Sequence, residues 1–141
     1  VLGASFGYAL FPGKEQDEAE EMRAGIIKSF YDSLKDEGHI LLELFGDERG
    51  SIFQYEKNPV DEDGEPTWQN QFYLKCFNID EVRRMVDLAG INPAEVNIYI
   101  GSRTENNLDS VVHLNLFEKE NPEINWNTPK GNYMIVDIKK T

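Results

Sequence analysis

The hydrophobic positions of this chain follow two spacings, and the segment 69–101 shows both of them clearly. Apolar side chains alternate with others over 69–77, which predicts a strand with one buried face. They then recur at helical spacing over 79–89 and alternate again over 96–101. The predicted order in this segment is therefore strand, helix and strand.

The residues at the two ends of 79–89 support a helix with these boundaries. Asn78 precedes the first apolar position, and Glu81 follows three residues later. The Asn78 side chain can accept a hydrogen bond from the Glu81 N–H while the Glu81 side chain reaches back to the Asn78 N–H. Gly90 follows the last apolar position and can adopt the positive φ that commonly ends a helix.

A longer helix is predicted over 15–37. Its first turns are rich in carboxylates, which the helix dipole favours at an N-terminus, and Gly38 is placed to end it. An apolar stripe at helical spacing runs along it, formed by Ala19, Met22, Ile26, Phe30 and Leu34.

Alternating or continuous apolar runs predict the remaining strands. The segment 39–45 is apolar at nearly every position, which predicts a central strand covered on both faces. A glycine-bounded turn separates it from 51–57, and this arrangement predicts a hairpin between the two. The full set of these additional strands is 5–11, 39–45, 51–57, 109–117 and 132–139.

Together these elements predict an α+β fold in one domain, residues 1–141. We expect a mostly antiparallel sheet of six to seven strands, packed by a long N-terminal helix and a second, shorter helix. After residue 38 the order is three strands, a helix and further strands. That order is also expected of an OB-like barrel, which is the alternative fold for this part of the chain.

Charge separates the two halves of the chain. The formal net charge is −12, and residues 1–66 contain 16 Asp and Glu against 6 Lys and Arg, a net of −10. Such a field repels nucleic acid and anionic membranes at a distance and favours basic partners, although it is also what a well-solvated acidic surface would give. No apolar run reaches the length of about 18 residues needed for a membrane helix, so no membrane association is expected.

The single cysteine, Cys76, lies within a predicted strand among apolar residues. One cysteine cannot form an internal disulfide, and its presence is consistent with a reducing compartment, so we expect a cytoplasmic protein. A Cys–His nucleophile would need His39 or His113, but the neighbours of Cys76 predict a packed thiol.

An acidic loop is the first candidate binding site. The segment 58–67 contains two prolines, one glycine and four carboxylates, so it should project into solvent. A calcium loop aligned on Gly64 would put Pro59 at the first ligand position, which rules out an EF-hand. The predicted partner-binding residues are Asp61, Glu62, Asp63, Glu65 and Trp68.

Aromatic strand residues are the second candidate site. On an OB-like barrel they could stack on single-stranded nucleic acid, with Lys75 or Arg103 assisting. Aromatic residues at alternating strand positions are more often part of a core, and basic charge is sparse for a groove that follows phosphates. The predicted nucleic-acid-binding residues are Phe53, Tyr55, Tyr73, Arg83, Arg84 and Phe117.

Common catalytic signatures are absent from the sequence, and His39, Cys76 and His113 show no metal-ligand spacing. No catalytic residue, metal or cofactor is therefore predicted. We expect a non-enzymatic acidic binding protein of the inhibitor, immunity or nucleic-acid-mimic type, acting on a basic protein partner. The alternative is a single-stranded nucleic-acid-binding accessory protein with an OB-like core, and a small hydrolase ranks third.

Overall fold

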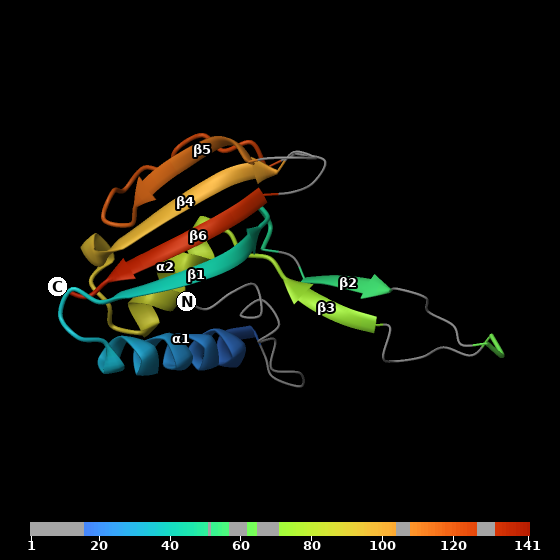
Figure 1. Ribbon diagram of the computed structural model, residues 1–141, viewed down its shortest axis with the longest axis horizontal. Coiled ribbons are helices and arrows are strands. Elements are labelled where there is room, and N and C mark those ends of the chain that lie inside the picture. The colour runs from blue at the N-terminus through green and yellow to red at the C-terminus, as the bar shows by residue number, and fades with distance from the viewer. Residues whose placement is uncertain (1–15, 51, 57–61, 65–70, 104–107, 127–131) are drawn as a thin grey trace.

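The computed structural model describes residues 16–50, 52–56, 62–64, 71–103, 108–126 and 132–141. A four-stranded antiparallel sheet lies against two helices, and a separate two-stranded ribbon projects from one end (Figure 1). The helices are α1 (Gln16–Ser33) and α2 (Ile79–Leu88), and a short 3-10 turn, η3 (Pro93–Glu95), leads into β4. The strands are β1 (His39–Gly46), β2 (Ile52–Glu56), β3 (Gln71–Lys75), β4 (Val96–Arg103), β5 (Leu108–Asn115) and β6 (Asn132–Lys139).

The α+β class with two helices is confirmed, but the sheet is smaller than predicted. Its order is β1-β6-β4-β5, so four strands replace the expected six to seven. The predicted strand 5–11 lies outside the described residues. β2 and β3 pair only with each other among the described strands, because the chain leaves the sheet after β1 and meets it again only at Phe77, which forms a single parallel bridge with Gly46 just before α2.

Three further expectations about the strands are wrong. β1 is an edge strand rather than a central one, and its residues alternate between buried and partly exposed. It pairs with β6, so no hairpin joins it to β2. The OB-like barrel is not closed either, since β1 and β5 lie at opposite edges of the described sheet. Local sequence could not foresee this, because the partner of β1 is the last strand of the chain.

The hydrophobic core lies between one face of the sheet and the two helices. Alternate residues of each strand point into it, including Leu42, Val136, Ile98 and Leu114. The helices contribute side chains such as Val82 of α2. Because both helices pack on this face, the opposite face of the sheet is left without a described helix over it (Figure 1).

The predicted caps of α2 are confirmed. The Asn78 side chain accepts from the Glu81 backbone N–H at 2.8 Å, and the Glu81 carboxylate accepts from the Asn78 N–H at 3.3 Å. Gly90 has a φ of +71°, as expected for the residue after a helix. The helix therefore starts and stops where its local sequence predicted.

The first helix ends at Ser33, four residues before the predicted end, and the last residues of the chain contact the segment where it ends. Lys140 Nζ donates to the carbonyls of Tyr31 and Leu34, at 3.3 and 3.1 Å. The Glu37 N–H donates to the Lys140 carbonyl at 2.7 Å. These contacts replace the glycine cap expected at Gly38.

A buried ion pair joins the base of the ribbon to α2. Lys75 Nζ lies 2.5 Å from Glu81 Oε2, and both side chains are only 7% exposed. Lys75 also donates to the Gly50 carbonyl, and it lies over the Phe77 ring at 5.3 Å from the centroid. The Arg23 guanidinium is also near this ring, 5.7 Å from its centroid. The ion pair thus joins the ribbon's base to α2, and Arg23 of α1 lies near the same Phe77 ring.

Candidate functional site

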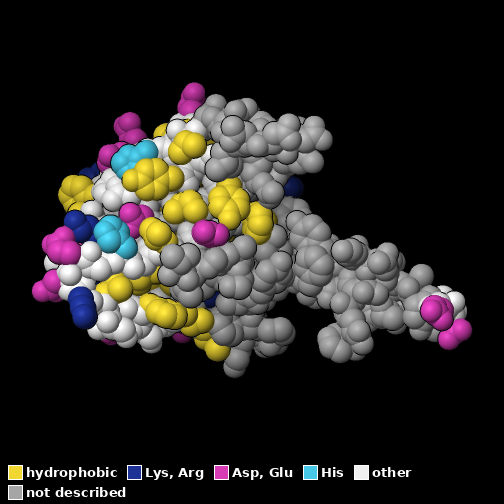
Figure 2. All heavy atoms as spheres, in the orientation of Figure 1, with side chains coloured by type: hydrophobic (Ala, Val, Ile, Leu, Met, Phe, Trp, Pro, Cys, Tyr) yellow, Lys and Arg dark blue, Asp and Glu magenta, His cyan; other side chains and the backbone are white. Residues whose placement is uncertain are grey.

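The candidate functional site is the sheet face opposite the helices, which we call the open face. The strand register aligns side chains in rows across it. In one row Glu43 pairs with Ile135, Ile135 with Tyr99, and Tyr99 with His113. Figure 2 shows hydrophobic side chains gathered over these strands, with carboxylates and both histidines among them. The residues of the open face are Leu41, Glu43, Phe45, Asn97, Tyr99, Val111, His113, Asn115, Tyr133, Ile135 and Asp137.

Several apolar groups on or beside the open face are exposed to solvent. Val111 is 59% exposed and Tyr99 is 39% exposed, and Phe117, just beyond the end of β5, is 71% exposed. Among the described segments, no helix or loop covers these side chains. A group of exposed aromatic and branched side chains on one surface is a feature of interaction sites.

Neighbouring contacts hold the aromatic side chains of the open face in place. Tyr99 stacks on His113 with ring centroids 4.9 Å apart, and His113 Nε2 lies 2.9 Å from Asn97 Oδ1. On the other side of the sheet's centre, Phe45 packs edge-on against Tyr133 at 5.6 Å. These contacts reduce the entropy that the rings would lose on binding.

Two carboxylates give the open face its negative charge. Glu43 accepts a hydrogen bond from the Tyr133 hydroxyl at 3.0 Å. Asp137 lies 2.7 Å from His39 Nδ1, and its side chain is 24% exposed. Each carboxylate has further lone pairs, so each can still accept from an incoming cation.

The acidic loop predicted to bind a partner is described only at 62–64. Glu62 and Asp63 are exposed there, at the end of the ribbon farthest from the sheet (Figure 2). Asp61, Glu65 and Trp68 lie outside the described residues. The described part agrees with a projecting acidic tip, and it places that tip away from the open face.

The basic residues proposed to contact nucleic acid are engaged within the protein. Arg83 donates to the Leu116 carbonyl at 2.6 Å, to the Glu118 carbonyl at 3.1 Å and to Asn121 Oδ1 at 2.8 Å. Arg84 pairs with Glu20 at 3.2 Å. Lys75 is buried in its ion pair.

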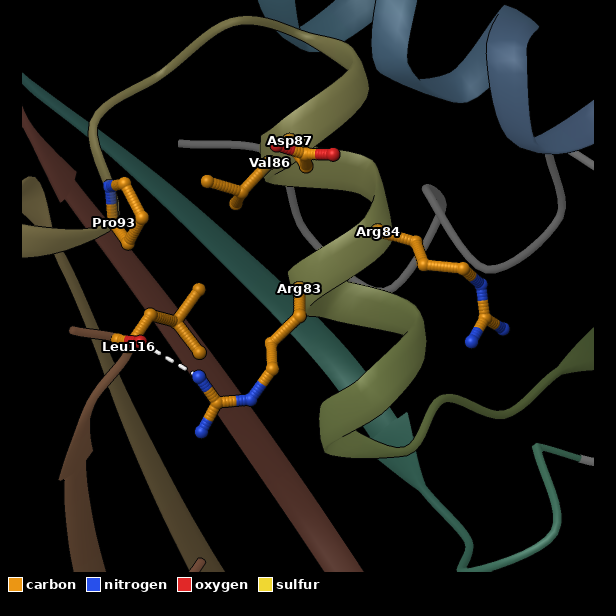
Figure 3. A pocket seen from close by; sticks show the side chains of 6 residues that line it. All are labelled: Arg83, Arg84, Val86, Asp87, Pro93 and Leu116. Atoms are coloured by element: carbon orange, nitrogen blue, oxygen red, sulfur yellow. Dashed lines mark hydrogen bonds between the residues drawn. The ribbon is translucent and has the colours of Figure 1, made fainter. Parts of the chain in front are cut away.

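Figure 3 shows these two arginines pointing away from each other, with Arg83 on the side of Leu116. They line a cavity of about 310 Å³ between α2 and the chain that leaves β5. Because Arg83 makes three hydrogen bonds there, its role is to fasten that segment to the helix.

Of the aromatic residues predicted to bind nucleic acid, only Phe117 has a described side chain. Phe117 follows β5 and is exposed, whereas the others belong to strands of the separate ribbon. The side chains of Phe53, Tyr55, Tyr73 and Arg103 lie outside the described part of the structure. The predicted set thus comes from the ribbon strands, from α2 and from the turn after β5.

No reactive thiol is found at Cys76. Its side chain is buried, and burial raises the pKa of the thiol to about 11, with Asp47 contributing in the same direction. His113 stacks on Tyr99, and His39 pairs with Asp137. Among the described residues no three His, Cys, Asp or Glu side chains are grouped to hold a metal ion.

Sequence reasoning missed the open face, although its signal is present. The residues between the buried positions of β4 and β6 include Tyr99, Tyr133 and Ile135, which are unusually apolar for a solvated face. What the sequence did not show is that both helices pack on the same side of the sheet.

Comparisons with known protein-family models, curated proteins and solved structures give no significant match to this chain. In the described part of the chain, neither helix combines the length and apolar character needed to cross a membrane.

Proposed function

We propose that this is a non-enzymatic binding protein that captures a basic protein partner on its open face. The observation that carries the proposal is a sheet whose uncovered side presents exposed Tyr99 and Val111 on the same face as the carboxylates Glu43 and Asp137. Aromatic side chains supply apolar contact area at interfaces, and carboxylates pair with lysine and arginine. The surface therefore suits a partner that carries both apolar and basic groups.

The overall charge supports the same partner. A net charge of −12 accelerates the approach of a positively charged protein and slows that of a polyanion. Glu62 and Asp63 extend this field to the tip of the ribbon. The capture of a basic protein by an acidic one is the mode of action expected of an inhibitor, immunity protein or nucleic-acid mimic.

Single-stranded nucleic acid is the second candidate ligand. The exposed rings of Tyr99 and Phe117 favour it, because bases stack on such rings with little dependence on sequence. Glu43 and Asp137 oppose it, since they lie where phosphates would approach. Arg83 and Arg84, which were proposed to bind phosphates, make hydrogen bonds within the protein, so they do little to offset the repulsion of phosphates by these carboxylates.

The test is a titration of fluorescent peptides that combine lysine, arginine and aromatic residues, with glutamate-substituted peptides and a single-stranded oligonucleotide beside them. The informative variant is Glu43→Gln with Asp137→Asn, which keeps hydrogen-bond acceptors but removes both charges. Its matched control is Glu21→Gln with Asp87→Asn on the helix layer, where both side chains are exposed.

We expect the basic peptides to bind and the affinity to fall with salt. The open-face variant should weaken binding and flatten its salt dependence, while the control variant should keep more of the affinity and more of its salt dependence. Equal effects of the two variants, or no binding of any basic peptide, would contradict the proposal. Saturable binding of the oligonucleotide alone would favour the second candidate.

A further inference from the structure

A second cavity lies at one end of the sheet, away from the residues that form the open face. Its volume is about 590 Å³, within the range typical of small-ligand sites. Ile100, Ile124 and Trp126 provide apolar walls. Trp126 and Ile124 also pack against the hydrophobic core, which holds these walls in place.

Asn132 lines the same cavity and has an unused acceptor. Its side chain is 1% exposed, and its Nδ2 donates to the Asn125 carbonyl at 2.9 Å. This bond fixes the orientation of the amide, because a carbonyl cannot donate to Oδ1. Among the described residues, Asn132 Oδ1 is the one buried side-chain nitrogen or oxygen without a hydrogen-bond partner. A buried acceptor of this kind needs a donor.

The charged residues that line the cavity indicate what kind of group donates to Asn132 Oδ1. Glu48 and Glu123 line the cavity with exposed side chains. Within the described part of the chain, neither carboxylate makes a hydrogen bond or ion pair through its side chain. Two unneutralised carboxylates repel anions and attract cations, and apolar walls beside them favour an organic cation over a hydrated metal ion.

We infer that this cavity binds an ammonium or guanidinium group carried on an apolar stem. The N–H groups of the cation donate to Asn132 Oδ1 and to the carboxylates of Glu48 and Glu123, while the stem packs on Trp126. Lysine and arginine side chains share this chemistry with free alkylamines. If the source is a side chain of the basic partner, the inference rests on the proposed function; a free amine does not require it.

The direct test uses small probes and no partner. In a Trp68→Phe background, Trp126 is the only tryptophan, so its fluorescence reports on the cavity. The probes are n-butylguanidinium, n-butylammonium and the neutral N-butylurea, with calcium ion as a fourth. We expect both organic cations to saturate and butylurea to bind about tenfold more weakly, because it lacks the charge.

Variants locate the binding. Glu48→Gln with Glu123→Gln should weaken the binding of both organic cations by about threefold to tenfold, as expected for two partly exposed ion pairs. The same change should leave the affinity for butylurea unchanged. Glu118→Gln with Glu120→Gln is the matched control, because both residues are exposed on the same segment but do not line the cavity. Asn132→Leu should weaken all three organic probes.

Several outcomes would overturn the inference: equal binding of butylurea and butylguanidinium, equal effects of the two glutamate pairs, or binding of calcium alone. The comparison of probes and the glutamate variants decide the question even if Asn132→Leu does not fold. A structural water at Asn132, with no response to any probe, would also overturn it.

Two further experiments distinguish a partner side chain from a free amine as the bound cation, and distinguish the cavity inference from the proposed function. If a partner side chain occupies the cavity, butylguanidinium should compete with an arginine peptide, and alanine in place of that arginine should abolish the competition. A free amine would bind without displacing the peptide. Peptide binding without probe binding would remove the cavity inference and leave the proposed function intact, whereas the reverse result would remove only the proposed function.

Discussion

Replacing Lys75 with methionine is the change from which we expect the largest loss of stability. Lys75 Nζ and Glu81 Oε2 are 2.5 Å apart, with both side chains 7% exposed. Methionine has a similar length and would fill the space, but it would leave the Glu81 carboxylate buried without its counter-ion. It would also leave the Gly50 carbonyl without a donor.

The magnitude follows from two opposing energies. At an effective dielectric constant near 20, two charges at this separation attract by about 7 kcal/mol, and desolvation of both ions offsets most of that gain. Removing one partner keeps the cost of the other, which in such pairs destabilises a protein by about 3–5 kcal/mol. Arg23 is buried close by and interacts favourably with Glu81, so the lower end of that range is expected.

Urea denaturation measures this directly. We expect Lys75→Met to lower the midpoint by about 1–2 M. Adding Glu81→Gln should recover part of the loss, because glutamine removes the buried charge and still serves the capping box. Lys28→Met is the control: its ion pair with Asp32 is mostly exposed and should contribute less than about 1 kcal/mol. An effect of Lys75→Met no larger than that of Lys28→Met, or no recovery in the double variant, would refute the reasoning.

Three further predictions concern single sites. Cys76, with a thiol pKa raised to about 11 by burial, should react with a disulfide reagent at pH 8 about a hundredfold more slowly in the folded protein than in urea. Burial alone would raise the pKa of Glu95, but hydrogen bonds from Thr141 and Tyr31 lower it below 4.5. The stability that these hydrogen bonds give is complete above the ordinary carboxyl pKa of 4.5 and is lost as pH falls through the lowered pKa of folded Glu95. Glu95→Gln should therefore cost more free energy of unfolding at pH 7 than at pH 3. Gly50 has a φ of +62° and a β-carbon there would collide with the Glu81 carboxylate, so Gly50→Ala should destabilise by more than about 1 kcal/mol in thermal unfolding. Equal reaction rates of Cys76 in the folded protein and in urea would contradict the first prediction. Equal costs of Glu95→Gln at pH 7 and pH 3 would contradict the second, and an unchanged Tm of Gly50→Ala the third.

The sequence predicted those elements whose signals are local. The second helix has its cap, its stop and its apolar stripe within 13 residues, from Asn78 to Gly90, and the structure places both ends as predicted. The strand 132–139 was likewise placed correctly by its alternation. The caps of the helix are its own neighbours in sequence, whereas for the strand only the extent was local, since its partners β1 and β4 are distant in sequence.

Errors arose where a distant segment decides the outcome. The first helix ends earlier than predicted at a point that Lys140 contacts, and β1 pairs with β6, whose residues lie more than 85 positions further along the chain. An apolar strand such as β1 looks central when its partners are unknown. Only the pairing shows that it lies at an edge, with Leu41 and Phe45 on the open face.

The sequence did not predict the open face as a site. The composition of 58–67 predicted a loop that projects into solvent, and its two described carboxylates, Glu62 and Asp63, are exposed. Arg83 and Arg84 appeared to be available for a ligand, but tertiary contacts occupy them. The cavity beside Asn132 could not be predicted, because β4, β5, β6 and the segment before β6 meet only in the folded chain.

The most direct test of the central claim is a methyl NMR titration with the basic aromatic peptide. The two faces of the sheet carry different methyl groups: Leu41, Val111 and Ile135 lie on the open face, whereas Ile27 and Val82 lie in the layer between the sheet and the helices. We predict saturable shifts of the first group with little change in the second. Shifts confined to helix methyl groups, or none at saturating peptide, would contradict binding on the open face.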